Sequence, residues 1–415
     1  MPVEGARKTR ATTLAIPDPG GLERFLTGPD ALAWIRRGEG MVGLGCHVCL
    51  EFDSLDAADA WWSAWVADLD HDTELPGICG SGPLAFGSFA FDPANSRHRS
   101  KLVVPSLIVG RRQGRSWVTR VGDGLPALPQ VSDPPSQPVG VSVRADPIAE
   151  ARWMGTVAEV VDRIERNGLS KVVLARAVRA VAAGPIDGRS LVGCLIEHYP
   201  SCWTYLFGGL VGASPEMLVR RERGLATSRI LAGTIQRSGS EETDLKLAAS
   251  LARSSKNLIE HELAVTSVAE ALAPFCSGMN VPDAPYVLEL PNVLHLATDV
   301  TGVAHSEASA LQLAARLHPS AAVCGTPTSL ARTTISELEG LDRGRYSGPV
   351  GWIDTAGDGE WAIALRCGVI DQDDPSAIDL FAGCGIVAGS DPTEELAETK
   401  AKLSPMLDAL GATVS

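Results

Sequence analysis

The chain has 415 residues, with 36 Lys and Arg against 50 Asp and Glu, which gives a formal net charge of −14. This acidic balance argues against nucleic-acid binding through a broad basic face, so an anionic ligand would need a local positive pocket or a bound cation. The nine cysteines have no regular spacing and do not resemble a disulfide framework. No window approaches the roughly 18 apolar residues of a membrane span. We therefore expect a globular cytoplasmic protein that binds neither nucleic acid nor membrane, while its oligomeric state stays open.

The first 122 residues mix strand-like and helical patterns. Met41–Phe52 and Leu102–Val109 have the composition of strands, and Ala57–Leu69 has the periodicity of a helix. Prolines then accumulate between residues 123 and 148, which predicts a long surface connection. We expect this connection to separate an N-terminal part, residues 1–122, from a second region, residues 149–412.

The second region shows sharper patterns. An amphipathic helix is predicted at Ala149–Arg166, ended by Asn167-Gly168, and a second helix at Ser254–Phe275. Strands are predicted at Lys171–Val181, Thr204–Val211, Glu216–Arg221, Trp361–Ile370 and Ala377–Phe381. Strands in hairpin-like succession with helices interspersed favour an α+β fold over a doubly wound sheet.

The last predicted helix follows a glycine-rich turn, Gly383–Gly389. Asp391 is a suitable N-cap for it. At about 100° per residue, Glu395, Glu398 and Lys402 fall on one face. Two carboxylates one turn apart suit a hard cation such as Mg²⁺, and the lysine suits an anion. Taken alone, the same face also fits an ordinary solvated helix surface.

Other candidates are equally ambiguous one by one. Glu260 on the long helix fits surface charge, and Lys171 and Glu216 at strand starts fit exposed ends. His295 is typical of a half-buried histidine, and Tyr346 of a packed loop residue. The order of the surrounding motifs, however, is specific.

Eight motifs occur in a fixed order along the second region. They are Lys171-Val-Val-Leu-Ala-Arg176, Gly212-Ala-Ser-Pro-Glu216, Leu231-Ala-Gly-Thr234, Lys256-Asn-Leu-Ile-Glu-His261, Asn292-Val-Leu-His295, His318-Pro-Ser-Ala-Ala-Val-Cys-Gly-Thr-Pro327, Asp342-Arg-Gly-Arg-Tyr-Ser-Gly-Pro-Val-Gly351 and Phe381–Lys402. This series closely resembles the chorismate-utilising enzymes and, within them, the isochorismate synthases. The resemblance is strong from about Ala149 to Leu410. In the N-terminal part it is loose and rests chiefly on Phe86-Gly-Ser-Phe-Ala-Phe-Asp92.

The resemblance implies one large α+β unit in which two packed β-sheets are flanked by helices. It also implies that chorismate is the small-molecule substrate and Mg²⁺ the cofactor. Glu260, Glu395 and Glu398 match the Mg²⁺ ligands of the family. The positions that hold or surround the substrate are His295, Ala322, Tyr346, Arg366, Gly383, Gly385 and Lys402.

Two positions match the family's catalytic pair. Lys171 corresponds to the general base that activates water, and Glu216 to the general acid. In the family, water adds at carbon 2 of chorismate while the hydroxyl on carbon 4 departs. A departing hydroxide needs a proton, which a carboxylic acid with raised pKa supplies. A lysine accepts a proton only where its surroundings lower its pKa.

Three positions distinguish members of the family. Lys171 favours water over ammonia as the nucleophile. Ala232 stands where some family members carry a lysine that captures the substrate covalently, so covalent capture is not expected here. Ala322 favours a reaction that stops at isochorismate. The nearest alternative is a salicylate synthase, and an alternative of another class is a non-catalytic chorismate-binding subunit. The chain departs from the family pattern at Asn257, Leu294 and Cys324.

Overall fold

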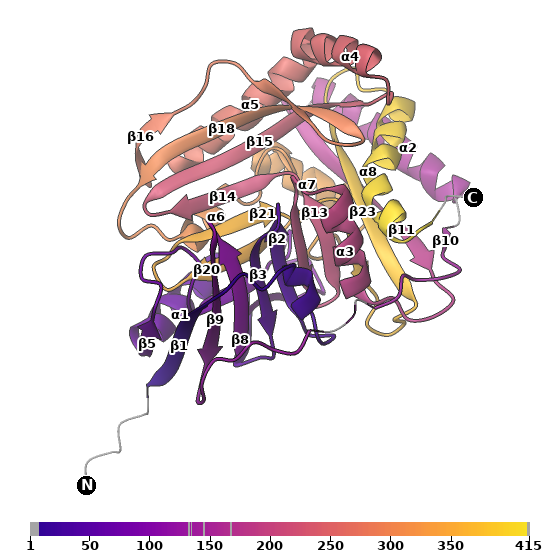
Figure 1. Ribbon diagram of the computed structural model, residues 1–415. Coiled ribbons are helices and arrows are strands. Elements are labelled where there is room, and N and C mark those ends of the chain that lie inside the picture. Colours follow the sequence, from indigo (N-terminus) through magenta and orange to yellow (C-terminus); the bar gives the residue numbers. More distant parts are fainter. Residues whose placement is uncertain (1–7, 132, 134, 144–145, 167, 413–415) are drawn as a thin grey trace.

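The computed structural model describes residues 8–412 except 132, 134, 144–145 and 167. Its main feature is a pair of β-sheets packed face to face, with helices on their outer faces (Figure 1). The expected α+β architecture is therefore confirmed. Because strands from both ends of the chain enter both sheets, the N-terminal part belongs to the same folded unit.

The larger sheet, sheet A, has 13 strands. In order they are β10 (Ser142–Val143), β11 (Lys171–Val181), β23 (Ala377–Ile386), β22 (Cys367–Ile370), β13 (Leu210–Ser214), β12 (Trp203–Phe207), β2 (Leu32–Arg36), β3 (Glu39–Leu44), β8 (Leu107–Arg112), β9 (Arg115–Val121), β1 (Thr9–Ile16) and β5 (Leu69–Thr73), with β19 (Gly325–Thr326) paired to β11.

The smaller sheet, sheet B, has 10 strands. In order they are β16 (Cys276–Asn280), β18 (Val293–Ala304), β15 (Leu225–Gln236), β14 (Met217–Glu222), β21 (Gly359–Ile363), β20 (Pro349–Asp354), β6 (Leu84–Ser88), β7 (Ser100–Val104) and β4 (Val48–Phe52), with β17 (Tyr286–Glu289) paired to β18.

The helices cover these sheets and connect their strands. They are α1 (Leu55–Ala67), α2 (Pro147–Arg166), α3 (Gly188–His198), α4 (Glu241–Arg253), α5 (Ser255–Leu272), α6 (Ala310–Leu317), α7 (Thr328–Leu338) and α8 (Pro392–Ala409), with a short 3-10 helix, η1 (Leu22–Phe25). α3 and α8 pack on sheet A, whereas α5 and α6 pack on sheet B. Between the sheets lies a core that includes Trp34 and Met41 from sheet A and Phe86 and Trp352 from sheet B. Burial of these large apolar surfaces holds the two sheets together.

The predicted helices agree with the structure to within about three residues, because a 3.6-residue period is a local signal. Asp391 caps α8 as predicted, accepting hydrogen bonds from the backbone N–H groups of Thr393 and Glu394 at 2.9 and 3.0 Å. The helix continues through Pro405 to Ala409. The expected stop at Asn167 lies outside the described residues.

Four predicted strands are wrong in extent. Met41–Phe52, Leu102–Val109 and Trp361–Ile370 each divide into one strand of sheet A and one of sheet B, and Thr204–Val211 spans the β12–β13 hairpin. Because the two sheets bury each other, the chain stays apolar where it passes from one sheet to the other. Hydrophobicity alone therefore does not show where one strand ends and the next begins.

The glycine-rich turn was also predicted too early. Gly383 and Gly385 lie within β23, where they pair with Ala175 and Val173 of β11, and the strand ends only at Ile386. Arg366, predicted within a strand, lies between β21 and β22 instead. Both differences bear directly on the candidate site.

Candidate active site

A cavity of about 880 Å³ lies between the two sheets, where β11 and β23 of sheet A face β14, β15 and β18 of sheet B. All twelve site residues predicted from the sequence line it. They are Lys171, Glu216, Glu260, His295, Ala322, Tyr346, Arg366, Gly383, Gly385, Glu395, Glu398 and Lys402. Residues more than 200 positions apart in the chain therefore meet at one concave site.

Lys171 is the first residue of β11, and its side chain is almost fully buried. Its Nζ lies 2.7 Å from Oε1 of Glu260 on α5. Gly385 of β23 faces this pair, and a Cβ on it would lie 2.7 Å from both Glu260 Oε1 and Lys171 Cε. A glycine at 385 thus leaves room for the pair at the cavity wall.

Glu216 lies just before β14 and is 5% exposed. Burial raises the pKa of Glu216 to about 7, against the opposing influence of Lys171, Lys402 and Arg366. A carboxyl with such a pKa is partly protonated near neutral pH. Glu216 is therefore able to donate a proton inside the cavity.

His295 and Arg366 form a second polar wall. Arg366 Nη2 lies 3.1 Å from His295 Nε2, and Thr234 Oγ1 lies 3.0 Å from His295 Nδ1. Because a guanidinium only donates, Nε2 is the acceptor, and the ring proton is on Nδ1 and is donated to Thr234. Burial, together with Arg366 and Lys402, lowers the pKa of His295 well below its usual value, in keeping with a neutral ring.

Arg366 has two features typical of a ligand-binding residue. Its φ of 49° lies in the left-handed region, which is costly for a side chain of this size and is often retained at functional sites. Its buried Nη1 has no hydrogen-bond partner among the described residues. A buried, unpaired guanidinium N–H suits a carboxylate supplied by a bound molecule.

Tyr346 and Ala322 belong to loops at the same cavity. The Tyr346 ring stacks on Phe381 with centroids 5.2 Å apart, and burial raises the pKa of its phenol. A Cβ on Gly383 would lie 3.0 Å from the Tyr346 hydroxyl. Gly383 therefore allows this hydroxyl to approach the β23 backbone, and the small side chain of Ala322 leaves space nearby.

The predicted polar face of α8 points into the cavity, since Glu395, Glu398 and Lys402 all line it. Lys402 Nζ lies 2.6 Å from Glu398 Oε1 and donates to the carbonyl oxygen of Gly383 at 2.9 Å. The solvated-surface interpretation of this face is therefore wrong. Gly383 contributes its carbonyl oxygen to this contact.

Glu260, Glu395 and Glu398 supply carboxylate oxygens to one side of the cavity, and oxygen is the donor that Mg²⁺ prefers. The space left by Gly385 lies beside Glu260 Oε1. These residues fit a hard divalent cation in chemical type. They do not all converge within 4.8 Å, so such an ion would keep water among its ligands.

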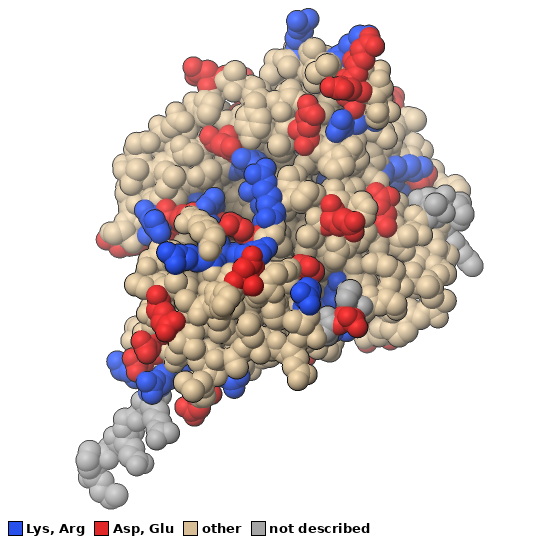
Figure 2. All heavy atoms as spheres, viewed as in Figure 1, with Lys and Arg blue, Asp and Glu red and all other residues tan. Residues whose placement is uncertain are grey.

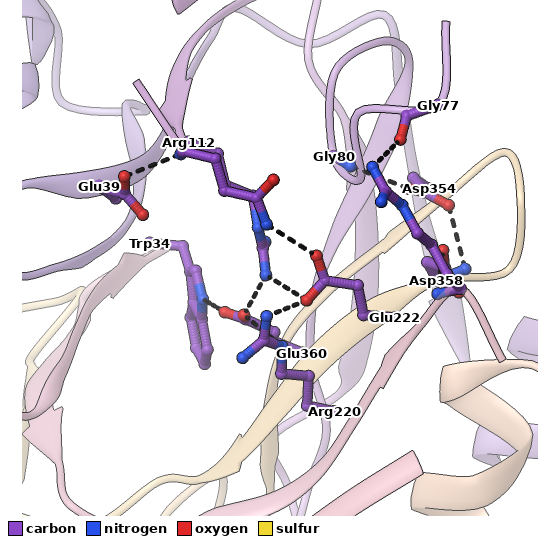
Figure 3. Close-up of polar contacts among 12 residues, drawn as sticks. Trp34, Glu39, Gly77, Gly80, Arg112, Arg220, Glu222, Asp354, Asp358 and Glu360 are labelled. Atoms are coloured by element: carbon purple, nitrogen blue, oxygen red, sulfur yellow. Dashed lines mark hydrogen bonds and ion pairs between the residues drawn. The ribbon is translucent and has the colours of Figure 1, made fainter. Parts of the chain in front are cut away.

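Within the described chain, a tighter potential ligand group is formed by Cys79, Asp354 and Asp358, away from the cavity. Asp354 accepts the backbone N–H groups of Gly80 and Asp358 at 2.9 and 3.0 Å (Figure 3), and Arg221 pairs with Asp358. Because the chain itself occupies these carboxylates, the group stabilises a loop.

Two residues that help to build the site had no assigned role in the sequence. His261 hydrogen-bonds to the Ala232 carbonyl at 3.2 Å and to Thr298 Oγ1 at 2.7 Å, which fixes α5 and its Glu260 against sheet B. Thr234 orients His295. Both stand in motifs that the sequence displays, but their partners on neighbouring strands are not visible from spacing.

The fold and the cavity define an enzyme-like site for a small anionic molecule, with a protonatable acid, a lysine and an unpaired arginine. A family model described as "Chorismate binding enzyme" matches residues 126–411. Isochorismate synthase MenF of Bacillus subtilis is 34% identical over 356 residues, covering 80% of this chain and 75% of that protein. This chain therefore belongs to the family of chorismate-binding enzymes.

Solved structures agree with this assignment. A Bacillus anthracis protein assigned as a 2,3-dihydroxybenzoate-specific isochorismate synthase, DhbC, has a TM-score of 0.79 at 30% identity, covering 94% of this chain and 99% of that chain. MenF, the menaquinone-specific isochorismate synthase of Escherichia coli, has a TM-score of 0.80 at 24% identity, covering 97% and 94%, which shows a common fold. Among the described helices, none is long and apolar enough to cross a membrane.

Proposed function

We propose that this protein is an isochorismate synthase that converts chorismate to isochorismate in the cavity between the sheets, in the cytoplasm. The observation that carries the proposal is the buried Glu216, with a pKa of about 7, in the same cavity as the amine of Lys171. An acid and a base on one small cavity suit a reaction that removes a hydroxyl and adds water.

The cationic groups of the cavity would position the substrate. Chorismate carries two carboxylates, and Arg366 Nη1 and Lys402 Nζ are the groups we assign to them. The Tyr346 hydroxyl would add a hydrogen bond that fixes the ring, and the neutral His295 would hold the Arg366 guanidinium in place. Orientation in a closed site contributes to the rate because reacting atoms are already near one another.

In the proposed reaction, Lys171 accepts a proton from the water whose oxygen bonds to carbon 2. The ring double bonds shift, and Glu216 gives its proton to the hydroxyl leaving carbon 4, which departs as water. One water enters and one leaves, so the product is an isomer of the substrate. Since Lys171 must be neutral to accept a proton, its ion pair with Glu260 has to open during the cycle.

We further propose that Glu260, Glu395 and Glu398 hold Mg²⁺, which when bound would neutralise the ring carboxylate. We expect a chelator to stop turnover and Glu398→Gln to raise the Mg²⁺ concentration needed for half-maximal activity, because the amide keeps the shape but loses the charge. Isothermal titration of Mg²⁺ into wild type and variant measures the same loss without turnover. Full activity in excess chelator would remove the metal from the proposal.

The decisive experiment is product analysis of the purified protein incubated with chorismate and Mg²⁺. We expect isochorismate alone; salicylate with pyruvate would instead identify a salicylate synthase, and no turnover would indicate a non-catalytic chorismate-binding protein. Isochorismate serves both quinone and catechol-siderophore synthesis, and the named relatives include a menaquinone-specific and a 2,3-dihydroxybenzoate-specific protein.

A further inference from the structure

A second hollow, of about 700 Å³, opens on the surface where the two sheets meet. Two hairpin tips border it, each a two-residue turn with positive φ at both positions: Arg37-Gly38 and Gln113-Gly114. Its charged lining comes from both sheets and consists of Arg36, Arg37, Arg112 and Arg220 with Glu39 and Glu360. Figure 2 shows Lys and Arg side chains gathered around a hollow in this face of the molecule.

Two of these arginines are neutralised by the protein itself (Figure 3). Arg112 Nη2 lies 2.9 Å from Glu360 and 3.3 Å from Glu222, and Arg220 contacts the same two carboxylates. Trp34 Nε1 donates to Glu360 at 2.7 Å. Although burial alone would raise it, the arginines hold the pKa of Glu360 below its usual value. This cluster needs no further ion.

Arg36 is different, because no carboxylate of the described chain lies within ion-pair distance of it. Its Nε donates to the carbonyl of Ser201 at 2.8 Å, and its guanidinium lies 4.0 Å above the ring of Trp203. Burial and the nearby charges of Arg229 and Arg37 lower the pKa of Arg36 to about 10. These contacts fix the guanidinium in place while its terminal nitrogens, Nη1 and Nη2, have no recorded protein acceptor.

Arg37 stands beside Arg36 at the rim, and its exposed side chain makes no ion pair with a described residue. The neighbouring Glu39 lines the same hollow, and its carboxylate accepts the backbone N–H of Gln113 at 2.8 Å. In a chain of net charge −14, four arginines against two glutamates in the lining of one concave surface are a local excess of positive charge.

We propose that this hollow is a binding site for a small oxyanion, a phosphate or a carboxylate, held by the terminal nitrogens of Arg36 with Arg37 closing over it. A fixed, planar guanidinium matches two oxygens of such a group at once, and the Trp203 ring beneath it limits the loss of side-chain entropy on binding. An oxyanion would also offset the mutual repulsion of Arg36 and Arg37. The proposal does not depend on the reaction in the cavity.

The test is calorimetric titration of the full-length protein with inorganic phosphate and, separately, with malonate, at constant ionic strength. We expect one saturable site whose affinity falls at least about tenfold in Arg36→Gln, since charge-assisted hydrogen bonds are lost. Arg36→Lys should lose part of the affinity, because it keeps the charge without the fork. Binding of only one probe would identify the ligand class, and binding of neither would overturn the proposal.

Two controls separate this site from other causes. Arg253→Gln removes one exposed positive charge on α4 and should bind like wild type. Lys402→Gln weakens anion binding in the cavity and should leave the hollow unaffected; loss of the titrated site in this variant would overturn the proposal. If Arg36→Gln unfolds, Arg37→Gln, whose side chain is exposed, provides the second variant, and wild-type affinity there would count against the site.

Discussion

Two buried glutamates in this protein illustrate opposite uses of a charged side chain. Glu216 in the cavity has a pKa raised to about 7, whereas Glu360 between the sheets has a pKa below its usual value. Both are buried, so burial does not explain the difference. Glu360 contacts Arg112, Arg220 and Trp34 within 3.4 Å, whereas no described cationic group forms an ion pair with Glu216, and Lys171, Lys402 and Arg366 act on it only at a distance.

The difference shows how a fold separates structural from reactive charge. Direct ion pairs keep Glu360 ionised and make it part of the packing. Leaving the carboxyl of Glu216 without such a pair lets it hold a proton near neutral pH. Arg366 and Arg112 differ in the same way, because Nη1 of Arg366 has no hydrogen-bond partner among the described residues whereas Arg112 forms ion pairs with Glu222 and Glu360. The unpaired Nη1 of Arg366 lies at the cavity, where a bound ligand would supply its missing partner.

The largest expected effect is at Lys171 in the cavity. Lys171→Ala removes the proposed base, and we expect turnover to fall by about 10²–10⁴-fold while the fold is retained. Steady-state kinetics with chorismate measures this, with circular dichroism as a check on folding. Lys246→Ala, an exposed lysine on α4, should keep full activity. Near-normal turnover of a folded Lys171→Ala protein would mean that another group is the base.

The next largest effect is expected on stability, at Glu360, the ion-paired one of the two buried glutamates. Glu360→Gln removes the more buried of the two carboxylates shared by Arg112 and Arg220 and leaves only Glu222, and we expect a loss of about 3–5 kcal/mol in unfolding free energy. Denaturant titration measures it. The exposed pair on α4 offers a matched control, since Glu242→Gln should cost at most about 0.5 kcal/mol. Equal losses of unfolding free energy in Glu360→Gln and Glu242→Gln would contradict the structural role assigned to Glu360.

Glu216 should show the reverse behaviour with pH. Its folded pKa of about 7 exceeds the value of 4.5 for an unperturbed glutamate. Between these values the folded state keeps a proton that the unfolded state has lost, so the unfolding free energy falls as the pH rises through this window. Relative to Glu216→Gln, we expect wild type to lose on the order of 3 kcal/mol from pH 4.5 to above pH 7.

Denaturant titrations of both proteins across this pH range give the difference, and two parallel curves would contradict the raised pKa. The same group should shape the kinetics. Because the proposed acid must be protonated, kcat/KM should fall as pH rises through about 7, and Glu216→Gln should lower turnover by about 10²–10⁴-fold. Activity that stays constant from pH 6 to 9 would assign the proton donor elsewhere.

The smallest expected effect is a change of product at Ala322. A threonine there adds a hydroxyl and a methyl to the cavity wall, and a misplacement of about 1 Å can change a rate by about 10²-fold. We expect Ala322→Thr to make less isochorismate and some salicylate with pyruvate. Chromatography of both reactions at equal chorismate and Mg²⁺ concentrations tests this. Isochorismate alone at the original rate would show that position 322 does not select the product.

The sequence by itself determined four helices, α1, α2, α5 and α8, and the membership of the site. The 3.6-residue period placed α2, α5 and α8, and the N-cap at Asp391 located the start of α8, because these signals are local. The polar face of Glu395, Glu398 and Lys402 followed from the same geometry. The family resemblance named twelve residues that line the cavity, eleven of them within the ordered motifs and Arg366 outside them, since a resemblance carries positions that spacing alone does not connect.

Only the tertiary structure decided how strands divide between the sheets and how the charges pair. Arg366 lies between β21 and β22, and β23 continues through Gly385 to Ile386. Where these strands begin and end depends on which strands pair with one another, and the hydrophobic pattern carries no information on pairing. The Lys171–Glu260 pair, the neutral His295 and the opposite pKa shifts of Glu216 and Glu360 arise between residues far apart in the chain. Electrostatic interactions depend on distance in space and on burial, and both exist only after the two sheets have packed.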